Sequence, residues 1–256
     1  MRPWCPADAH RVVCIGPPSV KGTTFHGTDT KESGNMRIGI LGTGSMAAAL
    51  GGAWTRAGHQ VLVGGRNAAS AAATAARIGA AGHGGLAEAA AHGEAVLFAL
   101  PADSAPAVAR ELAPLLARRT VLDCTVPMAP GPDGPSLTTG GGTDSVAARI
   151  AAAAPGAGVA KAFGICHESV WTLPRPAFEG AALAVPFCAV TPVAAEVTAR
   201  LITSMGCSPL PCGGLSRAAL LEATAVLAVG VWWSGGEARH AFPSPALAPG
   251  AVDDEA

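Results

Sequence analysis

The sequence predicts an α/β protein with a doubly wound, mostly parallel sheet and a smaller C-terminal α/β region. From residue 36 onward, short apolar runs of strand length alternate with alanine-rich stretches of helical length. Strands that alternate with helices form parallel sheets covered by helices on both faces. A glycine-rich turn joins the first apolar run to the first helical stretch, and 50% of the 256 residues are hydrophobic. A chain of this length and composition can bury a large core.

Residues 1–35 precede this pattern and differ from it. They carry Pro, Gly, Thr and polar residues without helical or strand periodicity, so we expect a disordered N-terminal extension. A signal peptide would need an unbroken apolar stretch, but prolines, Asp8 and Arg11 interrupt this segment. The alternative is that Met36 is the true first residue, because a strand begins directly after it.

Residues 36–165 are expected to form a first domain in which strands and helices alternate. The helix after the first strand should end near Gly58, because glycine readily takes the left-handed conformation that follows a helix. The predicted strands cover residues 37–41, 61–63, 95–100, 120–124 and 159–163, and the predicted helices cover residues 46–56, 68–77, 104–117 and 145–153.

A segment rich in Gly and Pro, residues 127–145, interrupts this alternation. It directly follows a predicted strand and contains too many of these residues for regular structure. Long irregular loops are uncommon in compact domains and are often functional, so we expect a lid over an active site here.

The smaller C-terminal region, residues 166–243, is expected to serve the substrate or a dimer contact, and residues 244–256 to form a flexible tail. Its predicted elements are strands at 182–187 and around Pro209, and helices at 194–204 and 216–233. The last helix is strongly apolar, but it carries Arg217 and Glu222 and falls short of the roughly 20 apolar residues of a membrane span. We expect it inside the protein or at a dimer contact rather than in a bilayer.

Composition excludes several classes of partner and site. With 17 basic and 18 acidic residues the chain lacks the positive field that nucleic acid or an anionic membrane requires, so we expect a small-molecule partner. Seven cysteines form no CxxC pair, which argues against a disulfide framework or a zinc site and favours reduced thiols in the cytoplasm. No metal site is expected. The absence of tyrosine excludes mechanisms that need a tyrosine acid.

The glycine-rich turn has the pattern of a dinucleotide-binding loop. Residues 42–47 read GTGSMA and match G-x-G-x-x-[GA] between a predicted strand and a predicted helix. Gly42 permits the tight turn, Gly44 lets the backbone approach a pyrophosphate, and Ala47 allows close helix packing. The helix amides and dipole attract the phosphates. The alternative is a glycine turn without a ligand.

The end of the second strand indicates which dinucleotide is bound. NAD sites usually place an acidic residue there, but this strand is followed by Gly65, Arg66 and Asn67. The Arg66 guanidinium suits a 2′-phosphate, with Asn67 and Ser70 adding hydrogen bonds, so NADP(H) is the expected cofactor. One charge-assisted bond could favour NADP over NAD by about ten- to a hundredfold. The alternative is that Arg66 is only a solvated surface residue.

The ends of the later strands should reach the same crevice, where ligands bind in open parallel sheets. Leu100 and Pro101 are expected against the adenosine or the nicotinamide ribose, and Thr125 is assigned to the cofactor site as well. Lys161 could contact a substrate acid or a neighbouring carboxylate, or it could be a lysine that reaches solvent from a strand edge.

His167 and Lys161 are the candidate catalytic residues. His167 and the adjacent Glu168 are plausible for proton transfer, since histidine titrates near neutral pH; the alternative is a polar loop without a catalytic role. His59 and His92 lie at helix-to-strand turns and are expected to be structural. The cysteines near the crevice, Cys124 and Cys166, are expected to be small core residues rather than nucleophiles.

Several segments together resemble the F420-dependent NADP oxidoreductases over about residues 36–235. They are MRIGILGTGSMAAALGGAWTRAGHQVLVGGRN, ALPADSA, DCTVP, PGAGVAKAFG and GGLSRAALLEATAVLAVG. The resemblance implies a Rossmann domain and hydride exchange between NADP(H) and the deazaflavin coenzyme F420, with the two rings stacked in a cleft, commonly in a homodimer. It gives the nucleotide-loop role to Thr43, Gly44, Ser45 and Met46 and the 2′-phosphate role to Arg66 and Asn67.

Two departures from the family concern the second substrate. The family's KAF turn usually continues with Asn, where this chain has Gly164, and the loop PGPDGPSLTTGGG, residues 130–142, is peculiar to this chain. Two other functions remain open. One is an NADP-dependent imine or ketone reductase, although the last helix lacks the catalytic lysine of the hydroxyacid-dehydrogenase relatives. The other is a non-catalytic NADP sensor.

Overall fold

The computed structural model describes residues 34–236. Residues 1–33 and 237–256 fall outside that range, and with them nearly all of the expected N-terminal extension and the whole of the expected tail.

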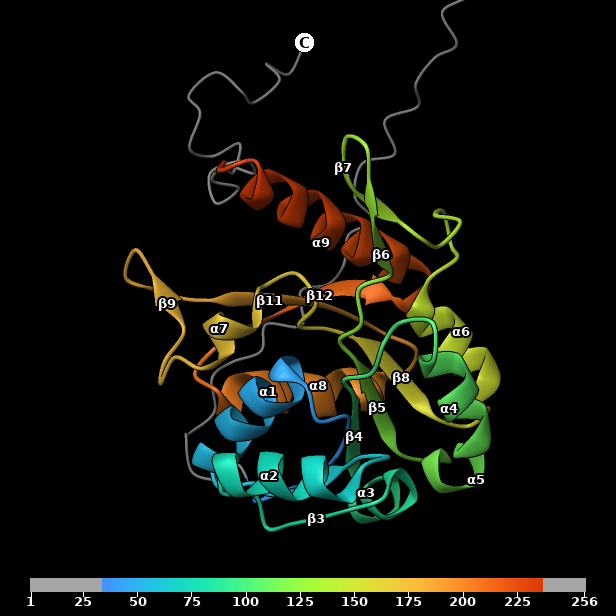
Figure 1. The fold of residues 1–256 in the computed structure, drawn as a ribbon, viewed down its shortest axis with the longest axis vertical. Coiled ribbons are helices and arrows are strands. Elements are labelled where there is room, and N and C mark those ends of the chain that lie inside the picture. The colour runs from blue at the N-terminus through green and yellow to red at the C-terminus, as the bar shows by residue number, and fades with distance from the viewer. Residues whose placement is uncertain (1–33, 237–256) are drawn as a thin grey trace, which may run out of the picture. The chain divides into compact units, whose positions relative to one another are not determined.

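An eight-stranded sheet runs through the described residues, with strand order β12-β11-β8-β5-β4-β1-β2-β3 (Figure 1). All neighbouring strands are parallel except β8 and β11, which pair antiparallel. The predicted doubly wound, mostly parallel sheet is therefore confirmed. The strands are β1 (Arg37–Leu41), β2 (Gln60–Gly64), β3 (Gly82–Gly84), β4 (Ala95–Phe98), β5 (Thr120–Asp123), β8 (Gly158–Lys161), β11 (Ala184–Ala189) and β12 (Ser208–Gly214).

Helices cover both faces of this sheet (Figure 1). Successive side chains of a strand point to opposite faces, and in β4 Ala95 and Leu97 join one core cluster while Val96 and Phe98 join the other. One face carries α1 (Ser45–Arg56), α2 (Ala68–Ile78), α7 (Glu168–Trp171) and α8 (Pro192–Ser204), and the other carries α3 (Leu86–His92), α4 (Ala105–Glu111), α5 (Ala113–Leu116) and α6 (Val146–Ala153).

Two local differences from the sequence-based elements have simple causes. The single helix expected over residues 104–117 is divided into α4 and α5, because Pro114 lacks an amide hydrogen and its ring clashes with the preceding turn. The helix α3 was not predicted; it is capped by Glu88, whose side chain accepts a hydrogen bond from the Gly85 amide at 2.6 Å.

The expectation of an irregular lid at residues 127–145 is wrong for its first half. There the antiparallel hairpin β6 (Met128–Gly131) and β7 (Gly134–Leu137) forms, closed by Pro132 and Asp133 and by Gly134 at φ +117°. Pro-Asp-Gly is a turn sequence, and prolines are tolerated in a two-stranded ribbon because its outer edges need no partner. The hairpin packs beside α9, with Pro135 near Gly230.

The last helix follows a 3-10 turn, η1 (Leu215–Arg217), and spans α9 (Ala218–Trp233). The stretch Leu215–Trp233 is long and apolar enough to cross a membrane by length and composition alone. In the fold it packs on the sheet, and its Glu222 carboxylate is buried against Lys161 of β8. Large apolar side chains stay exposed on its other side: Leu220, Leu227, Trp232 and Trp233.

The proposed division at residue 165 stays a prediction. β8 precedes it, β11 and β12 follow it, and all three belong to one sheet. A small two-stranded sheet of β9 (Ala177–Phe178) and β10 (Ala181–Ala182) lies between β8 and β11 in the chain.

Candidate active site

The glycine turn lies at the carboxyl end of β1, between the parallel strands β1 and β2. Gly42 has φ +130°, and a Cβ there would come within 2.1 Å of the Ala99 carbonyl oxygen, so another residue would not fit. A Cβ on Gly44 would meet nothing within 4 Å, which leaves its backbone open to a ligand. The helix α1 begins at the exposed Ser45 without a side-chain cap. The turn and the free helix start fit a pyrophosphate.

Neighbouring side chains hold the glycine turn in place. Thr74 of α2 donates a hydrogen bond from its hydroxyl to the Thr43 carbonyl oxygen at 3.1 Å. The Thr43 methyl group lies against Gly65, where a Cβ would come within 2.8 Å of it. Met46 packs against the core. The turn and the loop after β2 therefore lie in contact.

Arg66 and Asn67 occupy that second loop. Arg66 is exposed, and among the described residues it has no hydrogen bond or ion pair. Asn67 caps α2, since its Oδ1 accepts from the Ser70 amide at 2.9 Å. The amide group of Asn67 remains available to a ligand. This placement suits the predicted 2′-phosphate role, which the structure without a nucleotide leaves as a prediction.

Three further cofactor-site candidates follow β4 and β5 at the same edge of the sheet. Leu100 is half-buried and Pro101 is exposed after β4, and Thr125 is buried after β5. The strands β1, β4 and β5 are parallel neighbours, so these residues lie on the same side as the glycine turn.

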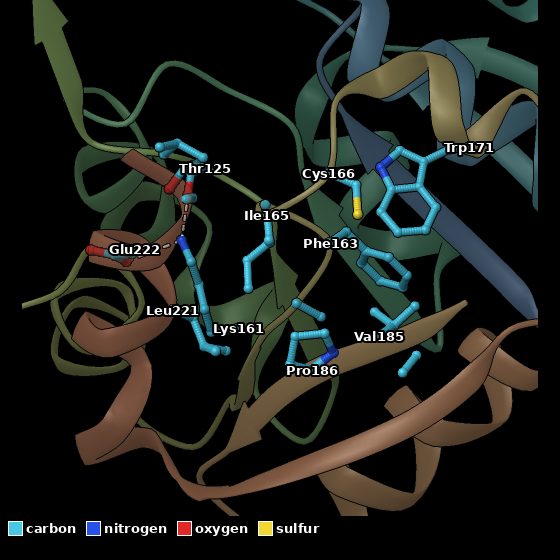
Figure 2. Close-up of a pocket in the computed structure, with 15 residues that line it drawn as sticks. Thr125, Lys161, Phe163, Ile165, Cys166, Trp171, Val185, Pro186, Leu221 and Glu222 are labelled. Atoms are coloured by element: carbon cyan, nitrogen blue, oxygen red, sulfur yellow. Dashed lines mark hydrogen bonds and ion pairs between the residues drawn. The ribbon is translucent and has the colours of Figure 1, made fainter. Parts of the chain in front are cut away.

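Beside Thr125 lies a buried ion-paired group, Asp123, Lys161 and Glu222, which we call the Lys161 cluster. Figure 2 shows Lys161 with Glu222 and Thr125. The Lys161 Nζ is 2.9 Å from Asp123 Oδ2 and 3.0 Å from Glu222 Oε1, and it also donates to the Thr125 carbonyl oxygen. The Val146 amide at the start of α6 donates to Glu222 at 3.0 Å. Three segments distant in sequence therefore meet at one ammonium group, and the start of α6 joins them through Glu222.

Electrostatics keep this lysine charged. Burial by itself would lower the pKa of Lys161, but Asp123 and Glu222 outweigh it and the pKa is raised. Burial raises the pKa of Glu222, although Lys161 acts in the opposite direction. The Lys161 cluster therefore places one ammonium group between two carboxyl groups.

This geometry decides among the expectations for Lys161. The alternative of a lysine reaching solvent from a strand edge is wrong, since the side chain is 2% exposed, and the expected contact with a neighbouring carboxylate is confirmed twice over. An ammonium has three donors, and Asp123, Glu222 and Thr125 take all of them. Lys161 is therefore placed to position these groups rather than to contact a substrate acid.

A narrow pocket, which we call the Trp171 pocket, adjoins the Lys161 cluster (Figure 2). It holds about one water molecule. Thr125, Lys161 and Glu222 line it on one side and Phe163, Cys166 and Trp171 on the other. Apolar residues complete the lining: Ile165, Val185, Pro186 and Leu221.

The turn that enters this pocket is strained and held by aromatic packing. Phe163 has φ +69°, a left-handed conformation that is costly for a bulky side chain. Its ring stacks edge to face with Trp54 (centroids 5.7 Å apart) and with Trp171 (5.4 Å). Gly164, the departure from the family, follows and also lines the pocket. Strained turns of this kind concentrate at functional sites.

The structure places His167 away from this pocket. Its side chain is 62% exposed; Nδ1 bonds to the Ser169 hydroxyl at 3.0 Å, and Nε2 lies 3.2 Å from Glu168. His167 caps the short helix α7, and it is not among the residues that line the Trp171 pocket. Its catalytic role stays a prediction.

The other expected structural residues are confirmed as such. His59 is buried; its Nδ1 accepts from the Met36 amide at 3.1 Å, and its Nε2 lies 2.9 Å from the Ser204 hydroxyl. Burial, and after it Arg200, lowers the pKa of His59. Burial raises the pKa of Cys124 to about 12 and that of Cys166 to about 11, so both stay protonated thiols near neutral pH.

Sequence reasoning did not assign a site role to Glu222 or Trp171. An acidic residue inside an apolar helix was the available signal for Glu222, since a buried charge needs a partner. For Trp171 no signal in the sequence distinguishes a pocket residue from a core residue.

Comparisons with known proteins agree with this architecture. Residues 37–127 match the family described as NADP oxidoreductase, coenzyme F420-dependent. A protein of Arthrobacter sp. FB24, described as a candidate F420-dependent NADP reductase, is 24% identical, with a TM-score of 0.70 over 79% of this chain and 96% of that chain. A hypothetical protein of Sinorhizobium meliloti is 22% identical, with a TM-score of 0.62 over 72% of this chain and 88% of that chain.

A reductive aminase of Aspergillus terreus, solved with NADPH and ethyl-5-oxohexanoate, has the same fold at lower similarity. It is 20% identical, with a TM-score of 0.56 over 79% of this chain and 64% of that chain. At such identities these structures establish the fold alone. The sequence has no significant match among curated proteins. The match identifies residues 37–127 as a domain of the coenzyme F420-dependent NADP oxidoreductase family.

Proposed function

We propose that this protein transfers a hydride from NADPH to the deazaflavin coenzyme F420. The proposal rests on one spatial relationship. The glycine turn, the loop with Arg66 and the Trp171 pocket all lie at the same edge of the parallel sheet. NADPH supplies two electrons and a proton as the hydride, and the acceptor takes its second proton from solvent. The match of residues 37–127 to the F420-dependent family supports the choice of acceptor.

The residues present fit a reaction that depends on positioning. In the Trp171 pocket the one ammonium group is fully hydrogen-bonded to protein acceptors, and the lining cysteine stays protonated. Direct hydride transfer needs two rings held in register more than it needs acid–base groups. In this proposal Gly42, Gly44 and Ser45 hold the pyrophosphate, Arg66 and Asn67 hold the 2′-phosphate, and Thr125 contacts the nicotinamide end.

The test is anaerobic mixing of the purified protein with NADPH and oxidised F420 while the deazaflavin absorbance is followed. Rapid bleaching with NADPH, and much slower bleaching with NADH, is the expected result. Tight binding of NADPH without bleaching would remove F420 as the acceptor and favour either another acceptor or a sensor that binds NADP without turnover.

Reduction of an imine is the second candidate, and one observation favours it. The two carboxyl groups of the Lys161 cluster lie beside the Trp171 pocket, and their oxygens would stabilise a protonated, cationic imine. If the protein oxidises NADPH with a cyclic imine and does not oxidise it with F420, imine reduction replaces the first proposal.

We further propose that the enzyme works as a cytoplasmic homodimer joined through α9. Leu227 and Trp233 of this helix are 60% and 64% exposed, and a second copy would cover them. Light scattering should give twice the mass of the chain for the wild type and the single mass for Leu227→Ser with Trp233→Ser. A monomeric wild type would contradict the proposal.

A further inference from the structure

The indole nitrogen of Trp171 has no hydrogen-bond partner among the described residues. The side chain is 1% exposed, and its Nε1–H finds no acceptor. Trp54, in the same aromatic group, donates its Nε1–H to the Leu201 carbonyl oxygen at 3.2 Å. Buried tryptophans normally have such a partner, because an unpaired buried donor is costly. The unpaired donor of Trp171 therefore indicates a missing acceptor atom.

The side chain that carries this donor belongs to the lining of the Trp171 pocket. In Figure 2 the nitrogen lies on the edge of the indole that faces Cys166, whose side chain also lines the pocket. The pocket holds about one water molecule, which matches one polar ligand atom rather than a whole ring.

Thr125 provides a second unpaired group in the same pocket. Its amide donates to Asp123 Oδ1 at 2.9 Å and its carbonyl oxygen accepts from Lys161, so its backbone is fixed. Its buried hydroxyl has no partner among the described residues. Figure 2 shows Thr125 and Trp171 on opposite sides of Ile165, so the pocket has one free polar group at each end.

The charge of the lining restricts the ligand. The one cation in the lining, Lys161, is paired with two carboxylates, and the side chains between the two ends are apolar. A carboxylate or phosphate group would find no free positive charge there, because the Lys161 ammonium is already taken by two carboxyl groups. A neutral carbonyl oxygen or ring nitrogen needs no such charge.

We propose that the Trp171 indole N–H is a specificity-determining donor that binds a neutral carbonyl oxygen or ring nitrogen on the rim of the hydride acceptor. The inference rests on the proposed function, in that the ligand is the hydride acceptor. It also assigns the two unpaired groups to different ligands: the Thr125 hydroxyl binds the cofactor, and the Trp171 indole N–H binds the hydride acceptor.

The test uses Trp171→Phe, which keeps an aromatic ring but removes the donor together with three ring atoms, in the intact protein. The KM for F420 should rise about 2- to 10-fold, the loss expected for one hydrogen bond, while the Kd for NADPH is unchanged. In urea without ligands Trp171→Phe should lose less stability than Trp54→Phe, because both variants lose the same buried ring volume and only Trp54 also loses a paired donor. Trp54→Phe is the matched control: it should lose stability, because its donor is paired, and keep both binding constants.

A second experiment tests the inference without any turnover of F420. Lumichrome, a neutral ring with two carbonyl groups and no phosphate, is titrated calorimetrically into the protein saturated with NADP. Binding that Trp171→Phe weakens by a similar factor supports the inference even where F420 is not reduced and the proposed function fails. If the KM for F420 and the lumichrome affinity are unchanged in Trp171→Phe, the donor binds only water. If the Kd for NADPH rises instead, the donor belongs to the cofactor site. Either result overturns the inference.

Discussion

The Lys161 ammonium lies 3.0 Å from the Glu222 carboxylate, and both side chains are almost fully shielded from solvent. This contact fastens the C-terminal helix α9 to β8 at the edge of the sheet where the candidate site lies. Through the Thr125 carbonyl oxygen it also fixes the segment that follows β5.

Breaking this ion pair from one side should be costly. Lys161→Met would leave the Asp123 and Glu222 carboxylates buried without a counter-charge, and we expect a loss of about 3–5 kcal/mol in the free energy of unfolding. Urea denaturation of the variant and the wild type measures it. The double variant Glu222→Leu with Lys161→Met should lose less free energy of unfolding than the two single variants together. Strictly additive losses would show that the two groups do not interact.

The cofactor preference depends on one exposed guanidinium. Arg66→Ala should weaken NADP binding by about ten- to a hundredfold and leave NAD binding unchanged, because only NADP carries the 2′-phosphate. Titration of both nucleotides measures this. Arg77→Ala, also an exposed arginine but in the last turn of α2, is the control and should bind NADP normally. Equal losses for both nucleotides in Arg66→Ala would place Arg66 outside the 2′-phosphate site.

The unpaired hydroxyl of Thr125 gives a second test of the cofactor site. Thr125→Val should raise the Kd for NADPH about 2- to 10-fold, because the variant loses one hydrogen bond to the nicotinamide end. Thr55→Val is matched, since Thr55 also has a buried hydroxyl without a partner among residues 34–236 but does not line the pocket. Fluorescence titration should show an effect only at Thr125; an unchanged Kd there would withdraw it from the cofactor site.

Acid should destabilise the protein through His59. Histidine in an unfolded chain titrates near pH 6.5, whereas burial lowers the pKa of folded His59. As pH falls below 6.5 the unfolded state therefore binds the proton first. The stability is complete above that pH and declines as pH falls through the folded-state pKa.

The measurement is the free energy of unfolding at pH 7.5 and pH 5.5 for the wild type and for His59→Gln. The decline between these values should be smaller in the variant, which has no imidazole to titrate. His83→Gln removes an exposed histidine and should keep the wild-type decline. An undiminished decline in His59→Gln would locate the pH dependence elsewhere.

The sequence by itself determined the strand and helix alternation and the glycine turn to which we assign nucleotide binding. GTGSMA, Arg66 and Asn67 act through local geometry: a glycine turn, the start of a helix and the first residues after a strand. The hairpin at residues 128–137 also has a local signal, because Pro-Asp-Gly is a turn sequence. The abundance of Gly and Pro around it nevertheless led to the expectation of an irregular loop. The division of the helix at Pro114 was open to the same kind of local reasoning.

Only the tertiary structure decided what surrounds the acceptor end of the site. Lys161 was recognised as a lone lysine near a crevice, but its partners come from β5 and α9, and no spacing in the sequence brings Asp123, Lys161 and Glu222 together. The unpaired donor of Trp171 is likewise invisible in a sequence, because it depends on which acceptors the packing leaves out of reach. Local signals specify the glycine turn after β1, whereas burial and charge pairing between distant segments specify the Trp171 pocket at the same edge of the sheet.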